Sequence, residues 1–384
     1  MGRYPGDPKH KEAEMKRKVA VVITSINDTT DFIKKYAANA EMHDEDVRFI
    51  VVEDVKSPHE ETRQWAEQFQ KFPRRDMEAN PLVRYMSPTW QNFWLSRSYP
   101  DMYHHLPWNT IARSNAGRLF AYDMGYDVII MLDDDNLATA DNFVKHHSVV
   151  GTTGDIIAVE STSGWYNVAQ SLVEENGVEF YPRGYPPEQR WHDGRMTYDT
   201  DLLKTVVNAG LWINDPDIDA ITRLERELKT TGMKDRRPDR LALLPGTWSP
   251  WNSQNTAIAR EALVAYWMSP YAGRHMDIWA SYVANAAIEH MGDAVSFGRP
   301  LANHDRVEHD LYKDLEQELP WIKKTDMFVD MLRNIQPFIK GSTYVETMRS
   351  IVELLRGPWI VLDFPPEYYK GLDIWVKIFE AKEK

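Results

Sequence analysis

The sequence predicts an α/β fold with a doubly wound, Rossmann-like and mostly parallel sheet, followed by a C-terminal helical extension. Apolar runs of strand length alternate with helical segments over residues 19–132, the order that builds parallel sheets. Polar or acidic loops follow the carboxyl ends of these runs, where open α/β sheets bind ligands. From about residue 311 the pattern becomes helical.

The individual elements follow from the spacing of apolar residues and from the turn residues between them. Strands are predicted at 19–23, 47–52, 127–132, 156–160, 242–244 and 255–259. Helices are predicted at 31–38, 60–70, 111–124, 260–268, 277–291, 325–339 and 343–356, with a weakly helical stretch at 162–175. Residues 72–108, with five prolines, are expected to be irregular and 176–220 to be rich in loops. Prolines at 320, 337, 358, 365 and 366 are expected to divide the C-terminal helices.

The chain is expected to divide into three parts. Residues 1–15 are charged, contain two prolines and two glycines, and are expected to form a flexible tail. Residues 16–315 would form the catalytic domain, and residues 316–384 the C-terminal helical extension packed on it.

Composition narrows the possible functions. The chain has 384 residues and no cysteine, which excludes disulfides, thiolate metal sites and cysteine nucleophiles. Its formal net charge of -13 provides no global basic field for nucleic acid, although a local basic groove stays open. No apolar stretch approaches the roughly 20 residues of a membrane span, and the polar N-terminus is unlike a secretory signal. We therefore expect a soluble, cytoplasmic enzyme.

Three consecutive carboxylates, Asp133, Asp134 and Asp135, end the apolar run at 127–132. Such neighbours raise one another's pKa unless a cation offsets their repulsion. Alternation along an extended chain points the first and the third the same way, which gives two oxygen donors for Mn²⁺ or Mg²⁺. A metal there could hold a diphosphate. The alternative is that Asp135 or Asn136 caps a following helix and that the other acids are solvated.

Other polar residues near these strand ends are candidates for binding a nucleotide. Thr24 and Ser25 could contact phosphate or ribose, and Asp54 could accept hydrogen bonds from a base or ribose. Each alone is better explained as ordinary loop chemistry, but their position with the acidic triplet at the ends of successive strands favours the binding role. Arg113 and Arg118 are about 140° apart around a helix, so only one is expected to face the site. Arg118 is the better candidate for diphosphate, the alternative being a surface ion pair.

A proline-rich segment displays two further arginines, Arg183 and Arg190, and is followed by the acidic block at 209–220. Flanking prolines and Gly184 make Arg183 rigid. Because arginine stays charged in water and is a poor nucleophile, its residue type suggests substrate clamping. The alternative is a loop held by ion pairs.

In these motifs the chain resembles the reversibly glycosylated polypeptides, the plant family of UDP-arabinopyranose mutases. That family has an Asp-Asp-Asp motif at a strand end, an Arg-Gly-Tyr-Pro segment with a second arginine seven residues on, and a Gly-Leu-Trp-(Leu/Ile)-Asn-x-Pro-Asp-x-Asp-Ala block. All three occur in this order at 133–135, 183–190 and 210–220. The likeness spans roughly residues 18–315.

Weaker likeness continues downstream. Residues 250–255 resemble the family's Pro-Met-Cys-Gly-Met-Asn, keeping the first proline and, as Asn255, the last asparagine. Residues 274–280 resemble Arg-Tyr-Asp-Asp-Met-Trp-Ala, so Asp277 is retained while Met276 replaces an acid. Residues 303–306 resemble Tyr-His-Ser-Lys, with His304 in the place of the family's histidine.

The resemblance implies a glycosyltransferase A-type nucleotide-diphosphosugar-binding fold, with Mn²⁺ or Mg²⁺ on the acidic triplet and His304 as a third metal ligand beside Asp133 and Asp135. It implies that Arg183 is the reversibly glycosylated arginine and Arg190 the second required arginine. Asp277 would act as a general base or orient the sugar hydroxyls, the alternative being an N-cap. The candidates for binding the nucleotide-sugar are Thr24, Ser25, Asp54, Arg118, Asp134 and Asn255. The family further implies assembly into homo-oligomers.

Two activities follow. The first is a UDP-sugar mutase, in which a sugar captured at Arg183 reopens in the other ring form and returns to UDP; Asp217, Asp219 or Asp277 could take the proton. The second is a glycosyltransferase that passes the sugar to a glycan, a protein, a lipid or a hydroxylated nucleic-acid base. The aromatic segment 84–108 could shape such an acceptor site or could be a packed structural loop. A non-catalytic sugar-nucleotide-binding subunit is a third class, disfavoured by the intact metal and arginine motifs.

Overall fold

The structure, a computed structural model, describes residues 17–25, 27, 29–42, 46–57, 60, 63–64, 83–139, 143–192, 194–235, 237–306, 310–357 and 364–383. The tail predicted at 1–15, most of the helix predicted at 60–70 and the proline at 358 lie outside these residues.

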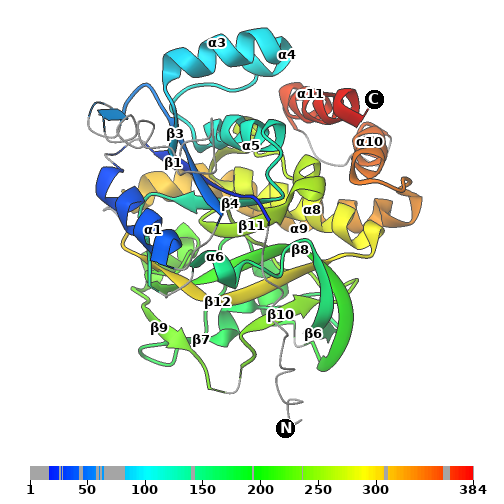
Figure 1. Ribbon diagram of the computed structural model, residues 1–384. Helices are drawn as coiled ribbons and strands as arrows, with labels where there is room; N and C mark the ends of the chain where they lie inside the picture. Colours follow the sequence, from blue (N-terminus) through cyan, green and yellow to red (C-terminus); the bar gives the residue numbers. More distant parts are fainter. Residues whose placement is uncertain are drawn as a thin grey trace.

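One mixed sheet of 12 strands runs through the described residues (Figure 1). Its strands are β1 Val19–Ser25, β2 Val47–Glu53, β3 Val83–Met86, β4 Val128–Asp133, β5 Asn136–Ala138, β6 Thr152–Ser161, β7 Leu172–Glu174, β8 Met196–Asn214, β9 Thr230–Met233, β10 Arg240–Leu243, β11 Asn255–Ala259 and β12 Ala294–His304.

Helices cover this sheet and form the C-terminal part. The α-helices are α1 Thr30–Met42, α3 Pro88–Ser98, α4 Pro100–Tyr103, α5 Ser114–Asp123, α6 Phe143–His146, α7 Ala220–Glu225, α8 Met276–Met291, α9 Leu311–Ile335, α10 Tyr344–Leu354 and α11 Pro366–Glu383. Short 3₁₀ helices are η1 Ile111–Arg113, η2 Val168–Ser171, η3 Pro187–Trp191, η4 Arg260–Ala265, η5 Pro270–His275 and η6 Gln336–Phe338.

The first half of the sheet is parallel, in the order β3-β2-β1-β4. Nearly every residue of β1, β2 and β4 is buried, as expected for strands covered on both faces. In the register, Thr24 pairs with Val52 on one side and with Asp133 on the other. Their carboxyl ends therefore meet at one edge, and the acidic triplet lies beside the loop that leaves β1.

The second half of the sheet closes on itself around the long strand β8. The first part of β8 pairs with β6 and its last part runs parallel to β12, while β10 joins β6 to β12. A small separate core, made of Ile156, Ala158, Ala242 and Ala294, packs among these strands. The ends of β8 and β12 coincide because Asn214 pairs with His304, which also pairs with Asn136 of β5. This arrangement carries His304 to the acidic triplet.

The C-terminal helices are fastened to the sheet domain. Trp279 of α8 packs against Trp321 and Phe328 of α9, and α10 and α11 lie side by side in Figure 1. Arg349 of α10 pairs with Asp373 at 2.5 Å and with Glu380 at 2.7 Å, both on α11. The predicted α/β fold with C-terminal helices is confirmed. Residue 316, where we place the start of the extension, lies in the second turn of α9.

Several segments differ from the prediction. Residues 83–103 are regular rather than irregular, because Pro88 and Pro100 occupy first positions of helices, where no N–H is needed. The loop-rich prediction for 176–220 is wrong at β8, whose first half is polar. The weak helix at 162–175 is instead η2 followed by β7. Pro320 does not interrupt α9, because Glu318 and Ile322 on either side are buried against the body.

Strand β12 was not predicted, since Gly298 and Pro300 interrupt its pattern. The structure accommodates both at irregularities in the pairing with β8.

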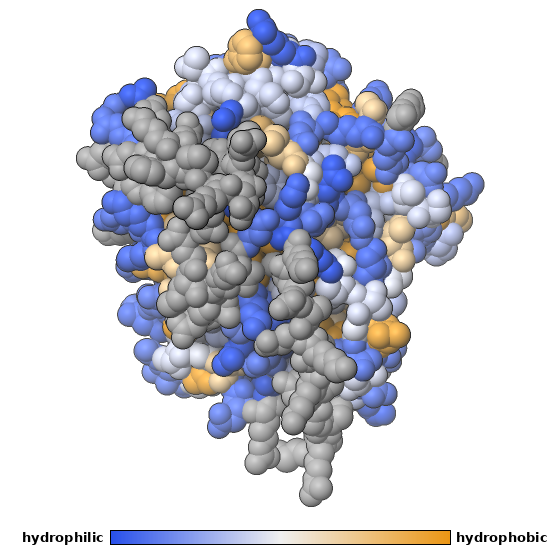
Figure 2. Space-filling model, viewed as in Figure 1, coloured by the Kyte–Doolittle hydropathy of each residue, from blue (hydrophilic) through white to orange (hydrophobic). Residues whose placement is uncertain are grey.

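On the face shown in Figure 2, the described residues are mostly hydrophilic, with small separate hydrophobic patches. Among the described residues no helix combines the length and the hydrophobicity that crossing a bilayer requires.

Candidate functional site

A cavity of about 770 Å³ opens at the carboxyl ends of the strands. Its walls come from Asp133 and Asp135, the segment that follows β8, the end of β12, the start of α8 and the exposed side of α9. The side chains on which the argument below depends are Asp133, Asp135, Arg183, Asp217, Arg223, Gln254, Arg274, Asp277, His304, Arg306, Glu316, Gln317 and Trp321. Carboxylates and guanidinium groups thus line one space that is large enough for a nucleotide-sugar.

The acidic triplet divides as strand alternation predicts. Asp133 and Asp135 line the cavity, whereas Asp134 accepts hydrogen bonds from Ser25 and, at 3.1 Å, from Asn27 in the loop after β1. The helix-capping alternative does not apply, because β5 rather than a helix follows Asp135. Burial raises the pKa of Asp133 well above its usual range, and the carboxylates of Asp135 and Asp134 raise it further. A positive ligand at this point would relieve that repulsion.

His304 has the hydrogen bonds of a metal-binding histidine. Its Nδ1 is 2.6 Å from the carbonyl oxygen of Asp215, which can only accept, so Nδ1 carries the proton and Nε2 is the acceptor in the neutral ring. Nε2 lies 3.2 Å from Asp135 Oδ2, and two acceptors at this distance need a proton or a cation between them. Although burial lowers the pKa of His304, the hydrogen bond to Asp135 and its charge outweigh burial and raise it.

The donor set therefore fits a divalent cation in its chemistry, with carboxylate oxygens and an imidazole nitrogen on one cavity wall. Within the described ranges, however, no three carboxylate or imidazole groups converge closely enough to hold a metal ion. The fit lies in the donor types and the shared wall, not in a preformed centre.

Arg183 is gripped by two carboxylates from distant parts of the chain. Its Nε donates to Asp217 Oδ1 at 2.8 Å, and its Nη1 and Nη2 donate to the two oxygens of Asp277 at 3.1 and 2.7 Å. Nη1 also donates to the carbonyl oxygen of Arg274 at 2.6 Å. Gly184, at φ 84°, lets the loop press against α8, since a Cβ there would overlap Ile278.

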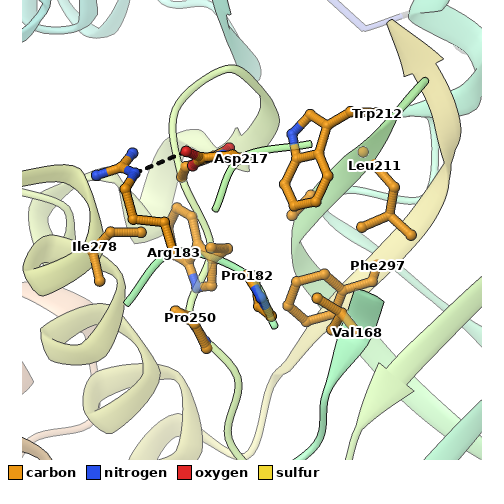
Figure 3. Close-up of a pocket in the computed structure, with 13 residues that line it drawn as sticks. Val168, Pro182, Arg183, Leu211, Trp212, Asp217, Pro250, Ile278 and Phe297 are labelled. Carbon is orange, nitrogen blue, oxygen red and sulfur yellow. Dashed lines mark hydrogen bonds and ion pairs between the residues drawn. The ribbon is translucent and has the colours of Figure 1, made fainter. Parts of the chain in front are cut away.

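The electrostatics around Arg183 favour its charged form. Burial alone would lower the pKa of Arg183, but Asp217 and Asp277 outweigh burial and raise it well above its usual range. Figure 3 shows the guanidinium directed at Asp217, with Ile278, Leu211 and Phe297 around the small apolar space beneath it. Burial would raise the pKa of Asp217, yet Arg183 and Asn252 lower it to about 2. The residue type predicted that Arg183 clamps the substrate. The structure shows a charged guanidinium that two carboxylates hold in place.

Arg190 lies outside the residues that line the cavity. It pairs with Asp219 and donates to the carbonyl oxygen of Tyr185 at 3.3 Å. Asp219 in turn caps α7 through the backbone N–H of Thr222 at 2.8 Å. Arg190 thereby fastens the loop that carries Arg183 to the block at 215–220.

Four other predicted residues, Thr24, Ser25, Asp54 and Asn255, lie outside the lining of the cavity. Asp54 accepts from the backbone N–H groups of Asn109 and Thr110 at 2.6 and 3.3 Å, and so shapes a loop of the cavity wall. Ser25 orders the turn after β1 and contacts Asp134. The hydroxyl of Thr24 is buried with no hydrogen-bond partner.

Asn255 is fully buried against Gly210, where a Cβ would collide with it, and its Oδ1 lies 3.0 Å from His147 Nε2.

Arg118, predicted to bind diphosphate, is not brought to the cavity. It is fully buried and donates to Asn115 and, at 3.1 Å, to the carbonyl oxygen of Tyr266, whose ring it also stacks on. Burial lowers its pKa to about 10. Arg113 is equally buried and donates to Gln91 and to the carbonyl oxygen of Leu106. Both arginines therefore stabilise the protein interior through hydrogen bonds.

Sequence interpretation missed three arginines that do line the cavity, namely Arg223, Arg274 and Arg306. Arg274 pairs with Asp314 and Glu318 of α9, both at 3.1 Å, and Arg306 pairs with Asp314 at 2.7 Å. Arg274 and Arg306 stand inside motifs that were recognised, which is the signal that could have found them. Nothing in the sequence pointed to the wall formed by α9.

Comparisons with known proteins agree with the sequence resemblance. No family model matches the chain. It is 27% identical over 277 residues to UDP-arabinopyranose mutase 1 of Arabidopsis thaliana, covering 70% of this chain and 72% of that protein. It is 24% identical over 263 residues to the probable UDP-arabinopyranose mutase 4 of the same plant, covering 67% of each. Identity to UDP-arabinopyranose mutase 3 is 28%, over 52% of that protein.

Solved structures give a more distant likeness. The mannosyltransferase PcManGT from Pyrobaculum calidifontis, in complex with GDP-Man and Mn²⁺, aligns with 98% of this chain and 72% of its own at 12% identity and a TM-score of 0.36. Glucosyl-3-phosphoglycerate synthase from Mycobacterium tuberculosis, with Mn²⁺ and UDP-glucose, gives 11% identity, coverage of 85% and 81%, and a TM-score of 0.38. In sequence, the chain is therefore similar to the UDP-arabinopyranose mutases, at 24–28% identity.

Proposed function

We propose that the chain is a UDP-sugar mutase that interconverts ring forms through a transient sugar-arginine adduct. One observation carries the proposal: Arg183 lies between Asp217 and Asp277 on the wall of the same cavity as Asp133, Asp135 and His304. Such a reaction requires two parts. One is a set of acids that binds a cation, and the other is a guanidinium group with a proton acceptor beside it.

The cation set would act on the diphosphate. Asp133, Asp135 and His304 would hold Mn²⁺ or Mg²⁺, which when bound supplies positive charge for a diphosphate leaving group. Arg223, Arg274 and Arg306, which line the same cavity, add fixed positive charge on the protein side.

Arg183 would capture the sugar. The bond between the anomeric carbon and the diphosphate oxygen breaks, a bond to Nη2 forms, and the proton displaced from Nη2 passes to Asp277. Because one proton leaves as the sugar arrives, the modified group stays a guanidinium. The captured sugar reopens and closes in the other ring form, and the same steps in reverse return it to UDP.

Asp277 is the proton acceptor in this proposal because it contacts the terminal nitrogens. Of the three acids that the sequence leaves open, Asp219 is engaged with Arg190. Asp217 contacts only Nε of Arg183, and its second oxygen accepts from Asn252 at 2.6 Å. The two oxygens of Asp277 accept hydrogen bonds from Nη1 and Nη2 of Arg183. Asp277 belongs to the first turn of α8 and is not its cap, so the alternative role does not explain it.

Transfer to an external acceptor is the second candidate function, and the wall formed by α9 favours it. Trp321, Glu316 and Gln317 add an aromatic face and polar groups to the cavity, and such groups bind sugars. The aromatic segment at 84–108 gives less support. Trp90 and Trp94 stack on each other at 5.4 Å and pack on Phe120, as a structural element does.

Self-labelling separates the two functions. The protein is incubated with radiolabelled UDP-sugar and Mn²⁺ without an acceptor, and the labelled peptide is mapped by mass spectrometry. A mutase is labelled at Arg183, the label is chased by unlabelled UDP-sugar, and Arg183→Lys abolishes it. Arg333 stacks on Trp165 at 4.7 Å and lies outside the cavity. Arg333→Lys is therefore the matched control, and this variant should be labelled normally.

Two results would reject the mutase. Label on another residue removes Arg183 from the mechanism. Absence of label, with transfer of sugar to an added acceptor, establishes the transferase instead.

A further inference from the structure

Met276 is an uncharged member of the cavity lining, and it stands next to the proposed site of sugar capture. It directly precedes Asp277, the acid that bonds to the terminal nitrogens of Arg183, and all three residues line the same cavity. Because neighbouring Cα atoms are about 3.8 Å apart, a sugar held at Arg183 beside Asp277 is within reach of the Met276 side chain.

The Met276 side chain crosses from α8 to the loop that precedes η1. Its Sδ lies 4.0 Å from Thr110 Oγ1, and the residue is only 8% exposed. Two apolar neighbours continue this part of the lining. Ile111 follows Thr110 in the chain, and Pro270 begins the short helix η5, which ends directly before Met276.

Trp321 of α9 extends the uncharged lining on the other side of η5. Gly273, at φ 53°, lets η5 lie against the indole, since a Cβ there would come within 2.4 Å of Trp321 Nε1. Trp321 also packs edge-on against Trp279 at 5.0 Å, so its ring is held in place. Ile111, Pro270, Met276 and Trp321 together form what we call the apolar wall.

The apolar wall includes a position at which this chain departs from the motif it resembles. An acid stands in that motif where this chain has Met276. A carboxylate accepts hydrogen bonds from sugar hydroxyls, whereas a thioether sulfur is a weak acceptor. A hydroxyl placed against Met276 would therefore lose its bonds to water without replacement, while a methyl group there would bury apolar surface.

We propose that Met276 is a specificity-determining residue, and that the apolar wall selects a nucleotide-sugar whose sugar is a 6-deoxy hexose. The inference rests on the proposed function, since it places the sugar at Arg183. C6 is the position that this reaction leaves free. The oxygens on C4 and C5 close the furanose and pyranose rings and so must both be present, whereas C6 lies outside both rings and its substituent projects furthest from them.

The test compares two pairs of nucleotide-sugars whose members differ by one oxygen atom. The pairs are UDP-galactose with UDP-6-deoxygalactose, and UDP-glucose with UDP-6-deoxyglucose. The Kd of each is measured with Mn²⁺ present, from the displacement of radiolabelled UDP. Wild-type protein, Met276→Gln, Met276→Leu and Met327→Gln are compared, and thermal unfolding of each variant checks that it folds.

In the wild type, the 6-deoxy member of at least one pair should bind about tenfold more tightly than its hydroxylated partner. Met276→Gln has nearly the same length but supplies an amide oxygen, so it should abolish or reverse this preference. Met276→Leu should keep it. Met327 lies on α9 outside the cavity lining at 45% exposure, so Met327→Gln is the matched control and should also keep it.

Equal affinities within both pairs, or tighter binding of the hydroxylated members, would overturn the inference. A preference that persists in Met276→Gln would remove Met276 from this role. If Met276→Gln does not fold, Met276→Thr supplies a hydroxyl acceptor at the same position and takes its place.

The readout distinguishes this inference from the proposed function, because a Kd is measured without transfer of the sugar. Preference for the 6-deoxy sugar in a protein that is never labelled at Arg183 would reject the mutase and retain the selection at Met276. Labelling at Arg183 with equal affinities within both pairs would retain the mutase and remove the selection.

Discussion

Replacement of Arg183 by methionine tests the electrostatic argument most directly. The side chain keeps much of its volume, but Asp217 and Asp277 are left buried without their shared cation. Removing one partner of a buried ion pair costs about 3–5 kcal/mol, mainly because a charge stays behind unpaired. At pH 7 we therefore expect Arg183→Met to lose about 3–5 kcal/mol of unfolding free energy.

The pH dependence of the unfolding free energy provides an independent test of this electrostatic argument. In the wild type the pKa of Asp217 is about 2, below its ordinary value of 3.8. Folding therefore gains about 2 kcal/mol from this group above pH 4, and the gain is lost as the pH falls toward 2. Without Arg183, the main cause that lowers the pKa of Asp217 is gone while burial still raises it, so this pKa should rise and the variant should lose less stability in acid. The stability gap between wild type and variant should narrow between pH 5 and pH 3.

Urea unfolding followed by tryptophan fluorescence measures both effects. Arg118→Met is the control, since that buried arginine contacts only uncharged groups and strands no carboxylate. Arg118→Met should lose less unfolding free energy than Arg183→Met, and this loss should be constant over the same pH range. A gap between wild type and Arg183→Met that stays constant or widens in acid would refute the charge assignment at Asp217.

Three further variants test the site. Asp277→Asn should slow self-labelling by about 10²–10⁴ while Mn²⁺ affinity, measured by calorimetry, changes little, since only the proton acceptor is lost; a normal labelling rate would exclude this role. Asp133→Asn should weaken Mn²⁺ binding by about tenfold or more, and unchanged binding would place the cation elsewhere. Arg118→Met should leave the Kd for UDP within about twofold in a filter-binding assay, because no part of Arg118 reaches the cavity; a large increase would restore its predicted role.

The parallel half of the sheet was predictable because strands covered on both faces are continuous apolar runs. β1, β2 and β4 are such runs, and their limits agree with the prediction within two residues. β8 and β12 were not, since a strand with polar exposed residues, or one containing Gly298 and Pro300, has no such signature. Prolines misled the prediction at α3, where proline begins a helix instead of ending one.

The site was predictable only where local chemistry decides it. Alternation alone placed Asp133 and Asp135 on one wall and Asp134 elsewhere. The partners of Arg183 were not predictable, because Asp217 and Asp277 lie 34 and 94 residues away in the chain. Periodicity could show that Arg118 and Arg113 face different directions, but not that both directions are interior.

The raised pKa of Arg183 bears on the choice between the two proposed activities. Its carboxylates make the guanidinium a stable cation, which favours electrostatic stabilisation and disfavours a free neutral nucleophile. Capture of a sugar is consistent with this only if the proton leaves as the bond forms, and the bond from Nη2 to Asp277 Oδ2 at 2.7 Å provides that path. Asp277→Asn retains an acceptor for the hydrogen bond but cannot take the proton. A mutase should therefore lose labelling in this variant, whereas a transferase that uses Arg183 only as a cation should keep most of its transfer rate.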